Sequence, residues 1–392
     1  MAESRYLVVG GGMTGDAACR GIRDHDPDGS ITIVGAEPHE PYARPPLSKA
    51  LWKGKPEDSI WRGTSELGVD LLTNRTVISL DLDARTALDD QGESHAYEKL
   101  LLATGGRPRS LPSAADGVVY FRVLDDYRRL RTLAGEGVRV AVVGGGFIGS
   151  EIAAALATNG CRVTMAFPDA GIGARLFPHD LALYVNDYYR SKGVDVLPEE
   201  LVASVAREGD GFLVTTEGGV EIEADAVVAG LGIEPATDLA ESAGLVVDDG
   251  VLVDELGRVD GRDDVFAAGD VARFPVPAFG GTRRVEHEDH ANTHGRVVGA
   301  NMAGAGEPYD HLPFFYSDLF ELGYEAVGDV DARLATEIEW AEPNRKGVVA
   351  YVEDGRPRGF LLWDVWDKVD AARALIRAGE PIDANALRAL LD

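Results

Sequence analysis

The sequence is short of cysteine and lysine and has no long hydrophobic run that is free of charge. Its 392 residues include only two cysteines, Cys19 and Cys161, which are far apart and form no C-x-x-C pair. This pattern does not support a disulfide scaffold, a structural zinc site or a dithiol redox centre, and it indicates a reducing cytoplasm. The most apolar long stretch, 138–157, contains Arg139, Glu151 and several glycines, so we expect a strand, a turn and a helix rather than a membrane span.

Basic residues are few: 38 Lys and Arg stand against 66 Asp and Glu, the net charge is −28, and only seven of the basic residues are Lys. Such a surface repels phosphates, which argues against general nucleic-acid binding. Two explanations of the charge stay open, a salt-rich cytoplasm and a base-composition bias that favours Arg over Lys. The start, MAESRYLVVGGG, has no basic flank, apolar core and cleavage site, so we expect no secretory signal.

Glycine is abundant, with 47 residues, and in a chain without repeats this favours tight turns and close approaches of backbone to ligand. Two segments have the order strand, glycine turn, helix, strand that opens a dinucleotide-binding βαβ unit. In the first segment these parts fall at residues 6–9, 10–12, 13–23 and 31–34, and in the second at 138–143, 144–146, 147–158 and 162–165. The repeat predicts two nucleotide sites, or one site and a degenerate copy.

The first fingerprint is Gly10-x-Gly12-x-x-Gly15, between a strand and a helix. Its first glycine makes the tight turn, the second lets the backbone approach a pyrophosphate, and the third lets the helix pack on the strand. The helix N-terminus then faces the phosphates. Glu37 follows the next strand, where an acid would bind the ribose hydroxyls. Together these features predict a bound dinucleotide.

The second fingerprint is Gly144-x-Gly146-x-x-Gly149, again at a strand-to-helix turn. Here the ribose acid is displaced, because Asp169 lies beyond the end of the following strand and Arg175 lies further on. A carboxylate repels a 2′-phosphate and favours NADH, whereas an arginine could attract the phosphate of NADPH. We expect NADH, with NADPH as the less favoured alternative.

Two dinucleotide sites on one chain suggest that two cofactors react directly, and FAD and NADH are the natural pair. Hydride passes from nicotinamide to flavin, so the task of the protein is to stack and orient two rings and to tune their electrostatics. No nucleophile or acid–base triad is required, and none is evident in the sequence.

Several short segments match the signatures of a known superfamily. They are PYARPPLSK at 41–49, ATGG at 103–106, GGGFIGSE at 144–151 and AGD at 268–270. Through them the chain resembles, over nearly its whole length, the FAD/NAD oxidoreductases with two dinucleotide folds. It is most similar to the apoptosis-inducing factors, with the bacterial NADH–ferredoxin reductases as cousins. The segments that point to that branch are FPD at 167–169, RVEHEDH at 284–290, YSDL at 316–319, GYEA at 323–326 and LWD at 362–364.

The resemblance implies roles for individual residues around the two rings. Arg44 would contact FAD near its phosphates, and Lys49 would lie near flavin N5 and pair with Glu151, which borders the nicotinamide. Such a pair is a plausible tuning element, because it can shift as charge arrives on the flavin. Tyr316 would stack beside both rings, and His287 would edge the flavin. We therefore assign the catalytic roles to Lys49, Glu151, Tyr316 and His287.

The resemblance also implies further cofactor contacts. Glu286 would edge the flavin, Asp270 would bind its ribityl chain, and the helix after His287 would direct its positive N-terminus at the ring. Other positions match FAD contacts, namely Val77, Ala103, Thr104, Gly105 and Arg122. The positions that match nicotinamide-dinucleotide contacts are Phe147, Ile148, Asp169, Arg175, Gly232 and Glu325.

The chain departs from the apoptosis-inducing factors in four respects. The ribose acid comes one place late, since Ala36 holds its usual position and Glu37 follows. Tyr316 stands where those proteins have Trp. We expect neither the mitochondrial targeting segment nor the long C-terminal insertion of those proteins, so the redox core should transfer and any death-signalling role should not.

The expected fold is α/β, with two Rossmann-like dinucleotide-binding domains of the glutathione-reductase type and a small α+β C-terminal domain. The predicted boundaries are 1–115 and 238–310 for a discontinuous FAD domain, 116–237 for the inserted NAD domain and 311–392 for the C-terminal domain. We expect a cytoplasmic protein without a membrane span, and leave a homodimer open.

The electron acceptor is less well defined than the donor. The first hypothesis is an iron–sulfur protein such as a 2Fe–2S ferredoxin, supplied with single electrons. The alternatives are an NADH dehydrogenase or oxidase that uses quinone, dye or oxygen, and a redox sensor of slow turnover that changes its oligomer or partner. The arginines at 128, 129 and 131 form either a solvated helix face or a docking site for an acidic ferredoxin. His287, His290 and His294 have helical spacing, but we assign them no metal.

Overall fold

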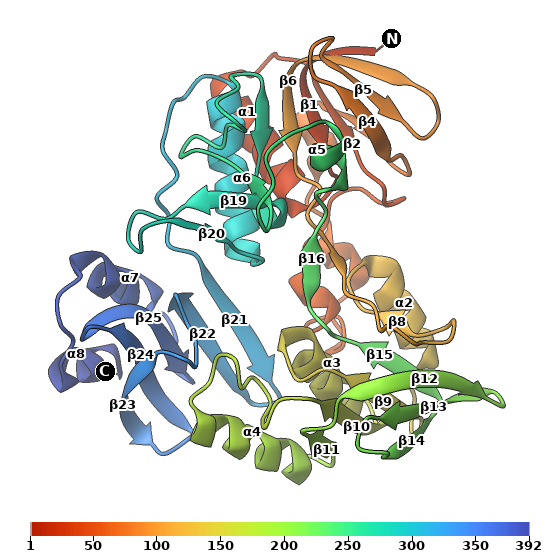
Figure 1. The fold of residues 1–392 in the computed structure, drawn as a ribbon, viewed down its shortest axis with the longest axis vertical. Coiled ribbons are helices and arrows are strands. Elements are labelled where there is room, and N and C mark those ends of the chain that lie inside the picture. The colour runs from red at the N-terminus through yellow and green to blue at the C-terminus, as the bar shows by residue number, and fades with distance from the viewer. Residues whose placement is uncertain (1, 392) are drawn as a thin grey trace. The chain divides into compact units, whose positions relative to one another are not determined.

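The computed structural model describes residues 2–391, which fall into two compact units (Figure 1). Unit 1 contains the residues up to Ala43 together with Asp58–Arg107 and Glu234–Pro313, and unit 2 contains Arg44–Glu57, Pro108–Ile233 and the residues from Phe314 onward. The chain passes from one unit to the other five times, after Ala43, Glu57, Arg107, Ile233 and Pro313, and two of these passages fall within β7 (Gly106–Pro108) and β16 (Ile233–Pro235). Each unit contains one of the two glycine fingerprints.

Unit 1 is built on a seven-stranded sheet. Six of its strands have the order β3-β2-β1-β6-β5-β4, and the seventh, β18, also pairs with β6. Five strands run parallel: β1 (Ala2–Val9), β2 (Ile31–Val34), β3 (Asp70–Leu72), β6 (Ser94–Leu102) and β18 (Val265–Ala267). The hairpin strands β4 (Val77–Asp81) and β5 (Thr86–Asp89) are antiparallel. The central strands are buried on both faces, which explains their continuous apolar runs.

Helices α1 (Met13–His25) and α6 (Glu288–Met302) pack against each other and against this sheet. The two helices approach each other closely because small residues lie at their contact. A Cβ added at Gly299 would meet the Ala18 carbonyl oxygen at 2.1 Å. Ile22 and Val298 bury their side chains in the same core as Ile33. The other elements of the unit are α5 (Asp238–Ser242), β17 (Val251–Leu252), β19 (Ala272–Pro275) and β20 (Thr282–Arg284).

Unit 2 contains a second parallel sheet, of order β11-β10-β9-β15-β8. Its strands are β8 (Val119–Tyr120), β9 (Arg139–Val143), β10 (Arg162–Phe167), β11 (Asp195–Pro198) and β15 (Ala226–Ala229), and its helices are α2 (Leu124–Leu133), α3 (Phe147–Thr158) and α4 (His179–Ser191). A meander of β12 (Val202–Glu208), β13 (Gly211–Thr216) and β14 (Glu221–Ala224) shares a hydrophobic core with Ala141 and Val143 of β9.

The C-terminal part of unit 2 is a five-stranded antiparallel sheet with two helices. Its order is β21 (Phe314–Leu319), β22 (Leu322–Gly328), β25 (Arg356–Trp363), β24 (Lys346–Glu353) and β23 (Ala335–Glu342). Asp354 and Gly355 both have positive φ at the turn between β24 and β25, as a tight hairpin turn requires. Helices α7 (Val369–Ala378) and α8 (Ala384–Leu391) pack against the sheet.

The predicted α/β class with two dinucleotide folds is confirmed, and short 3-10 helices complete the fold at Pro45–Leu47, Glu57–Ile60, Thr64–Leu67 and Gly269–Val271. The predicted domain boundaries stay a prediction, because the C-terminal sheet belongs to the same compact unit as the second glycine fingerprint. Among residues 2–391, no helix combines the length and the apolar character needed to cross a membrane.

Candidate functional site

The first glycine turn has the shape that a dinucleotide requires. Gly10 has φ +126°, and a Cβ there would meet the Ala103 carbonyl oxygen at 2.1 Å. A Cβ at Gly15 would meet the Gly10 carbonyl oxygen at 2.2 Å, whereas one at Gly12 would meet nothing within 4 Å. The first and third glycines are therefore fixed by packing, and the open side of the turn lies at the second, where a pyrophosphate approaches the helix N-terminus.

The ribose acid and the loop after β6 flank this turn. Tyr42 donates its phenolic hydrogen to Glu37 Oε2 at 2.5 Å, which orients the carboxylate of Glu37. Thr104 donates its hydroxyl hydrogen to the Ala236 carbonyl oxygen at 2.8 Å, and Gly105 has φ +67°. The displacement of the acid by one place therefore still leaves a carboxylate next to the first glycine turn, and this set fits the adenosine half of FAD.

Asp270 and His287 lie in the same unit. The Gly269 N–H donates to His294 Nδ1 at 3.3 Å, which holds the short helix that carries Asp270. His287 is the N-cap of α6, as predicted, and burial lowers its pKa to about 4, against the opposing effect of Asp270 and Asp289. Burial also lowers the pKa of His294, to about 3, so both imidazoles are neutral at pH 7.

Glu286 is paired with Arg284 Nη1 at 2.6 Å, just before α6. The other predicted FAD contacts divide between the units. Val77 begins β4 in unit 1 and is buried. Arg44 and Arg122 belong to unit 2, where Arg44 Nη1 donates to the Arg122 carbonyl oxygen at 3.0 Å. Val77, Asp270, Glu286 and His287 thus belong to the same unit as the first glycine turn, and Arg44 and Arg122 are bonded to each other in unit 2.

The second glycine turn repeats the geometry of the first. Gly144 has φ +114°, and a Cβ there would meet the Gly230 carbonyl oxygen at 2.4 Å. A Cβ at Gly149 would meet the Gly144 carbonyl oxygen at 2.1 Å, and one at Gly146 would again meet nothing within 4 Å. This agreement favours a second working nucleotide site over a degenerate copy.

The residues predicted to hold the nicotinamide dinucleotide belong to unit 2, as the second glycine turn does. Asp169 follows β10 and lies 3.7 Å from Arg175 Nε, and Gly232 follows β15 with φ +80°. Glu325, on β22, has a buried Oε2 without a hydrogen-bond partner, and burial together with the nearby Asp367 raises the pKa of this carboxyl. A buried acceptor of this kind fits a hydroxyl or amide group of a bound dinucleotide.

The predicted Lys49–Glu151 pair is present in unit 2. Lys49 Nζ lies 2.7 Å from Glu151 Oε1, and the side chains are 12% and 4% exposed. Glu151 stands one turn into α3, directly after the second fingerprint, and Lys49 follows the short helix Pro45–Leu47. Lys49 Nζ also lies 5.2 Å from the centroid of the Tyr316 ring. An ion pair, an aromatic ring and a glycine turn thus meet within one unit.

Two serines hold the same carboxylate, and we did not predict either of them. Ser48 donates to Glu151 Oε2 at 2.5 Å, and Ser317 donates to Glu151 Oε1 at 2.6 Å. Both are buried. Ser48 lies inside the recognised PYARPPLSK segment and Ser317 follows Tyr316, so motif membership was the only signal available. With hydrogen bonds to both oxygens, Glu151 is fixed in one orientation.

Aromatic side chains of the C-terminal sheet pack against α3, the helix that contains Glu151 of the Lys49–Glu151 pair. Phe147, the first residue of α3, meets Phe315 edge-to-face at a centroid distance of 5.0 Å. Phe315 also contacts the buried Tyr324 edge-to-face. Ile148 follows in the first turn of α3. The start of α3 and strand β21 are thereby locked together, which places Tyr316 beside Lys49.

The arrangement of two glycine cradles, one of them beside a buried Lys–Glu pair, corresponds to a defined class of enzymes. A family model of pyridine nucleotide-disulphide oxidoreductases matches residues 4–295, so the chain belongs to this family of oxidoreductases, which use FAD and a nicotinamide dinucleotide. A model described as the C-terminal part of apoptosis-inducing factor, mitochondrion-associated, matches residues 298–345.

Individual relatives narrow the comparison. Over 435 aligned positions the whole chain is 32% identical to apoptosis-inducing factor 1, mitochondrial, of Dictyostelium discoideum, and it covers 81% of that protein. It is 34% identical over 99% of its length to the ferredoxin–NAD(+) reductase component of the anthranilate 1,2-dioxygenase system of Burkholderia cepacia, 97% of which it covers. The crystal structure of the covalent putidaredoxin reductase–putidaredoxin complex matches with a TM-score of 0.92 and 28% identity, covering 100% of this chain and 96% of that one.

Proposed function

We propose that this chain is an FAD-dependent NADH oxidoreductase that passes electrons to a ferredoxin-type iron–sulfur protein. The observation that carries the proposal is the buried Lys49–Glu151 pair, held by two serines next to the second glycine turn. The similarity to a ferredoxin–NAD(+) reductase component and to putidaredoxin reductase, each over nearly the whole chain, supports the acceptor.

Bound FAD would supply the redox chemistry, accepting a hydride and releasing electrons one at a time. The residues of the chain bind and orient the reactants. Glu325 and the turn at Gly146 hold the dinucleotide, and Tyr316 positions its reactive ring by stacking. Lys49 presents a positive charge where negative charge develops, and Glu151, fixed by its serines, sets where that ammonium lies.

The choice of NADH rests on Asp169 and Arg175. Arg175 is the only cation that we predicted near the 2′-position, and its Nε lies 3.7 Å from the carboxylate of Asp169. A 2′-phosphate brought to this arginine would therefore also meet a negative charge, so NADPH loses more through repulsion than it gains.

Asp169→Asn should accordingly change nucleotide preference. We expect kcat/KM for NADPH to rise by about tenfold and that for NADH to fall, because the neutral amide removes the repulsion and releases Arg175 for a phosphate. Asp187→Asn is the matched control, since it changes the net charge equally at an exposed ion pair with Arg190. Steady-state kinetics with both nucleotides measure the effect, and an unchanged ratio in Asp169→Asn would refute the assignment.

A disulfide substrate is disfavoured despite the family name. The two cysteines belong to different units and carry free, buried thiols. Burial, and to a smaller extent Asp16, raises the pKa of the Cys19 thiol to about 12, so it stays protonated and unreactive. Free thiols also agree with the reducing cytoplasm that we propose as the compartment.

The arginines of α2 do not strengthen the case for an acidic partner. Arg128 pairs with Glu57 at 2.5 Å, Arg129 donates to the Gly117 carbonyl oxygen, and the Arg131 guanidinium lies 5.2 Å from a Trp52 ring centroid. All three are engaged within unit 2, as expected of an ordinary helix face. The proposal of an iron–sulfur acceptor therefore depends on the similarity and not on this patch.

Stopped-flow spectroscopy in two stages tests the function. The protein reconstituted with FAD should lose its oxidised flavin absorbance on mixing with NADH, and should regain it within a few turnover times when a 2Fe–2S ferredoxin is added. Quinone and oxygen serve as comparison acceptors at equal concentration. Faster reoxidation by quinone or oxygen than by any ferredoxin would overturn the acceptor, and a colourless protein that takes up no FAD would overturn the entire proposal.

A redox sensor is the second candidate, favoured by the match to the C-terminal model of apoptosis-inducing factor at residues 298–345. A sensor would hold the reduced state for minutes with every acceptor and change its assembly. Light scattering with and without NADH reports such a change and also determines whether the resting protein is the homodimer that we left open. Rapid turnover at constant size would exclude this candidate.

A further inference from the structure

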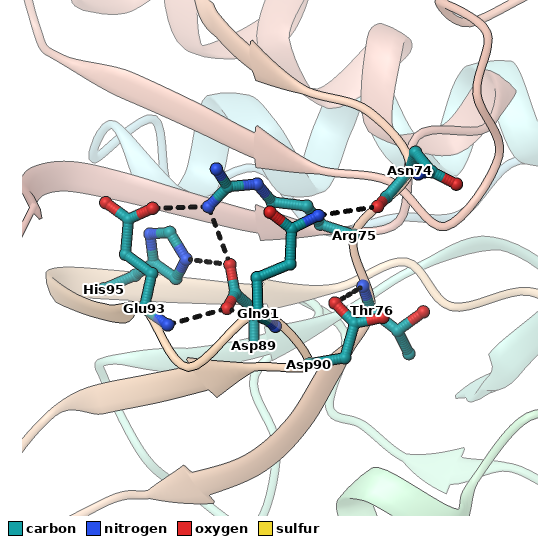
Figure 2. A network of polar contacts seen from close by, with 8 residues as sticks. All are labelled: Asn74, Arg75, Thr76, Asp89, Asp90, Gln91, Glu93 and His95. Atoms are coloured by element: carbon teal, nitrogen blue, oxygen red, sulfur yellow. Dashed lines mark hydrogen bonds and ion pairs between the residues drawn. The ribbon is translucent and has the colours of Figure 1, made fainter.

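A polar network in unit 1 joins the loop before β4 to the turn between β5 and β6 (Figure 2). Its centre is Asp89, whose side chain is 0% exposed. The donors to this carboxylate are Arg75 Nη1 at 2.9 Å, the Gln91 N–H at 3.0 Å, the Glu93 N–H at 2.8 Å and His95 Nε2 at 3.1 Å. Four donors fill the hydrogen-bonding capacity of a carboxylate.

These donors keep Asp89 ionised despite its burial. Burial by itself raises the pKa of this carboxyl, but the hydrogen bonds from His95, the backbone of Glu93 and Arg75 outweigh it and lower the pKa to about 2. Asp89 is therefore a permanent anion at any physiological pH. Of the two side chains that donate to it within residues 2–391, Arg75 is the one that is always charged.

The cluster does not have the arrangement of a metal centre. Asp89, Glu93 and His95 could each offer a ligand atom, and these atoms lie within 4.8 Å of one another. However, Arg75 Nη1 donates to both carboxylates, and Figure 2 shows the guanidinium between them. The position of the cation is thus taken by Arg75, so the network serves to hold this arginine.

The backbone of Arg75 is in turn bonded to the loop that carries the ribose acid. The Arg75 N–H donates to the Gly35 carbonyl oxygen at 3.0 Å, and the Asn74 N–H donates to the Glu37 carbonyl oxygen at 2.9 Å. Gly35 lies against the first glycine turn, since a Cβ at Gly11 would come within 3.2 Å of its Cα. The loop at 73–76, the loop at 35–37 and the glycine turn therefore form one continuous layer.

We propose that Arg75 and Asp89 are positioning residues for the adenosine end of FAD. The buried anion holds the guanidinium, the guanidinium fixes the loop at 73–76, and the two backbone hydrogen bonds fix Gly35 and Glu37 next to the glycine turn. The carboxylate of Glu37 is thereby kept in place for the ribose hydroxyls. This inference rests on FAD occupying the first glycine turn, as the proposed function requires.

Titration of the apoprotein with FAD and with ADP tests this role. ADP has the adenosine end of FAD but no flavin, so a defect in the part of the protein that binds this end must weaken the binding of both FAD and ADP. Arg75→Met should raise the dissociation constant of each by about tenfold or more, the usual effect of losing hydrogen bonds to a charged group. Arg75→Lys should restore affinity to within about threefold, because a single atom, Nη1, makes both contacts and an ammonium can replace it.

Arg85→Met is the matched control. Arg85 also belongs to unit 1 and pairs with an aspartate, Asp264, at 2.9 Å, and within residues 2–391 its hydrogen bonds go to Asp264 and Tyr97 and not to the loop at 35–37. Arg85→Met should leave the dissociation constants of FAD and ADP unchanged. Unchanged affinities in Arg75→Met, or weaker FAD binding with unchanged ADP binding, would overturn the inference, as would an equal loss in Arg85→Met.

A milder variant covers the case in which Arg75→Met does not fold. Glu93 is 42% exposed and supplies the second carboxylate, so Glu93→Ala should fold and weaken FAD and ADP binding by about threefold. No change in this variant would then count against the network. Failure of the proposed function can be told apart from failure of this inference, because in the first case the unaltered protein itself would bind no FAD.

Discussion

Lys49→Met is expected to slow the reduction of FAD by NADH by about 100-fold in protein saturated with both cofactors. Lys49 has a single ammonium group that contacts both Glu151 Oε1, at 2.7 Å, and the face of Tyr316, at 5.2 Å from the centroid. Methionine fills similar space but has no charge. The rate is measured from the decay of flavin absorbance after rapid mixing.

The size of the effect follows from burial. Glu151 is only 4% exposed, and breaking a buried ion pair leaves a charge that the surroundings poorly solvate. Ser48 and Ser317 keep their hydrogen bonds to the carboxylate, so the site should keep its shape while its positive charge is lost. The variant should therefore fold but unfold at a lower urea concentration, and the loss of the positive charge should appear in the rate of reduction of the folded protein.

A neighbouring lysine provides the control. Lys53 lies in the same segment and pairs with Asp318 of the same strand, β21, at 2.9 Å, but its side chain is 60% exposed. Lys53→Met should change the rate by less than about twofold, because exposed ion pairs contribute little. An undiminished rate in Lys49→Met, or an equal loss in both variants, would show that the pair has no part in hydride transfer.

The two glycine turns were predictable because their requirements are local. Gly10 and Gly144 must have positive φ, and the third glycine of each fingerprint must let the helix approach the preceding turn, so residue type and spacing within six positions are enough. The Lys49–Glu151 pair was predicted only through family resemblance. No local pattern links two residues so far apart in the sequence, and Ser317 completes the same site from a third segment.

Strand β6 shows why the hydrophobic pattern alone falls short. Its last residues, Leu100 to Leu102, are buried and apolar, which is the sequence pattern of a buried strand. Its first half lacks this pattern because one inward position there is occupied by His95, which is buried and bonded to Asp89. In the sequence, a buried polar residue that is hydrogen-bonded to a carboxylate elsewhere cannot be told from an exposed polar residue. The same Asp89 also holds Arg75, which we propose fixes the loop at 35–37.

Arg44 and Arg122 illustrate a second limit. Resemblance assigned both to FAD, and the structure pairs them with each other in unit 2, while the first glycine turn lies in unit 1. A motif specifies which residues recur but not which compact unit each joins, because that depends on long-range packing. Their contact with FAD therefore stays a prediction.

Gly146→Ala should weaken NADH binding without harming the fold, raising the dissociation constant by about 100-fold or more. Gly146 is the N-cap of α3 with φ −83° and ψ −165°, a conformation open to any residue, and a Cβ there meets nothing within 4 Å. The added methyl therefore occupies only the space through which a pyrophosphate approaches the helix N-terminus. FAD content and the urea midpoint of unfolding should stay at their original values.

Two further glycines make the argument specific. Gly12→Ala introduces the same methyl at the open position of the first turn, so it should remove FAD and spare the binding of NADH. Gly149→Ala places a Cβ 2.1 Å from the Gly144 carbonyl oxygen, so it should lower the urea midpoint as well. If Gly146→Ala binds NADH as the unaltered protein does, the second turn is a degenerate copy of the first. The hydride donor would then have to bind elsewhere, because a methyl group placed where the pyrophosphate binds must weaken that binding.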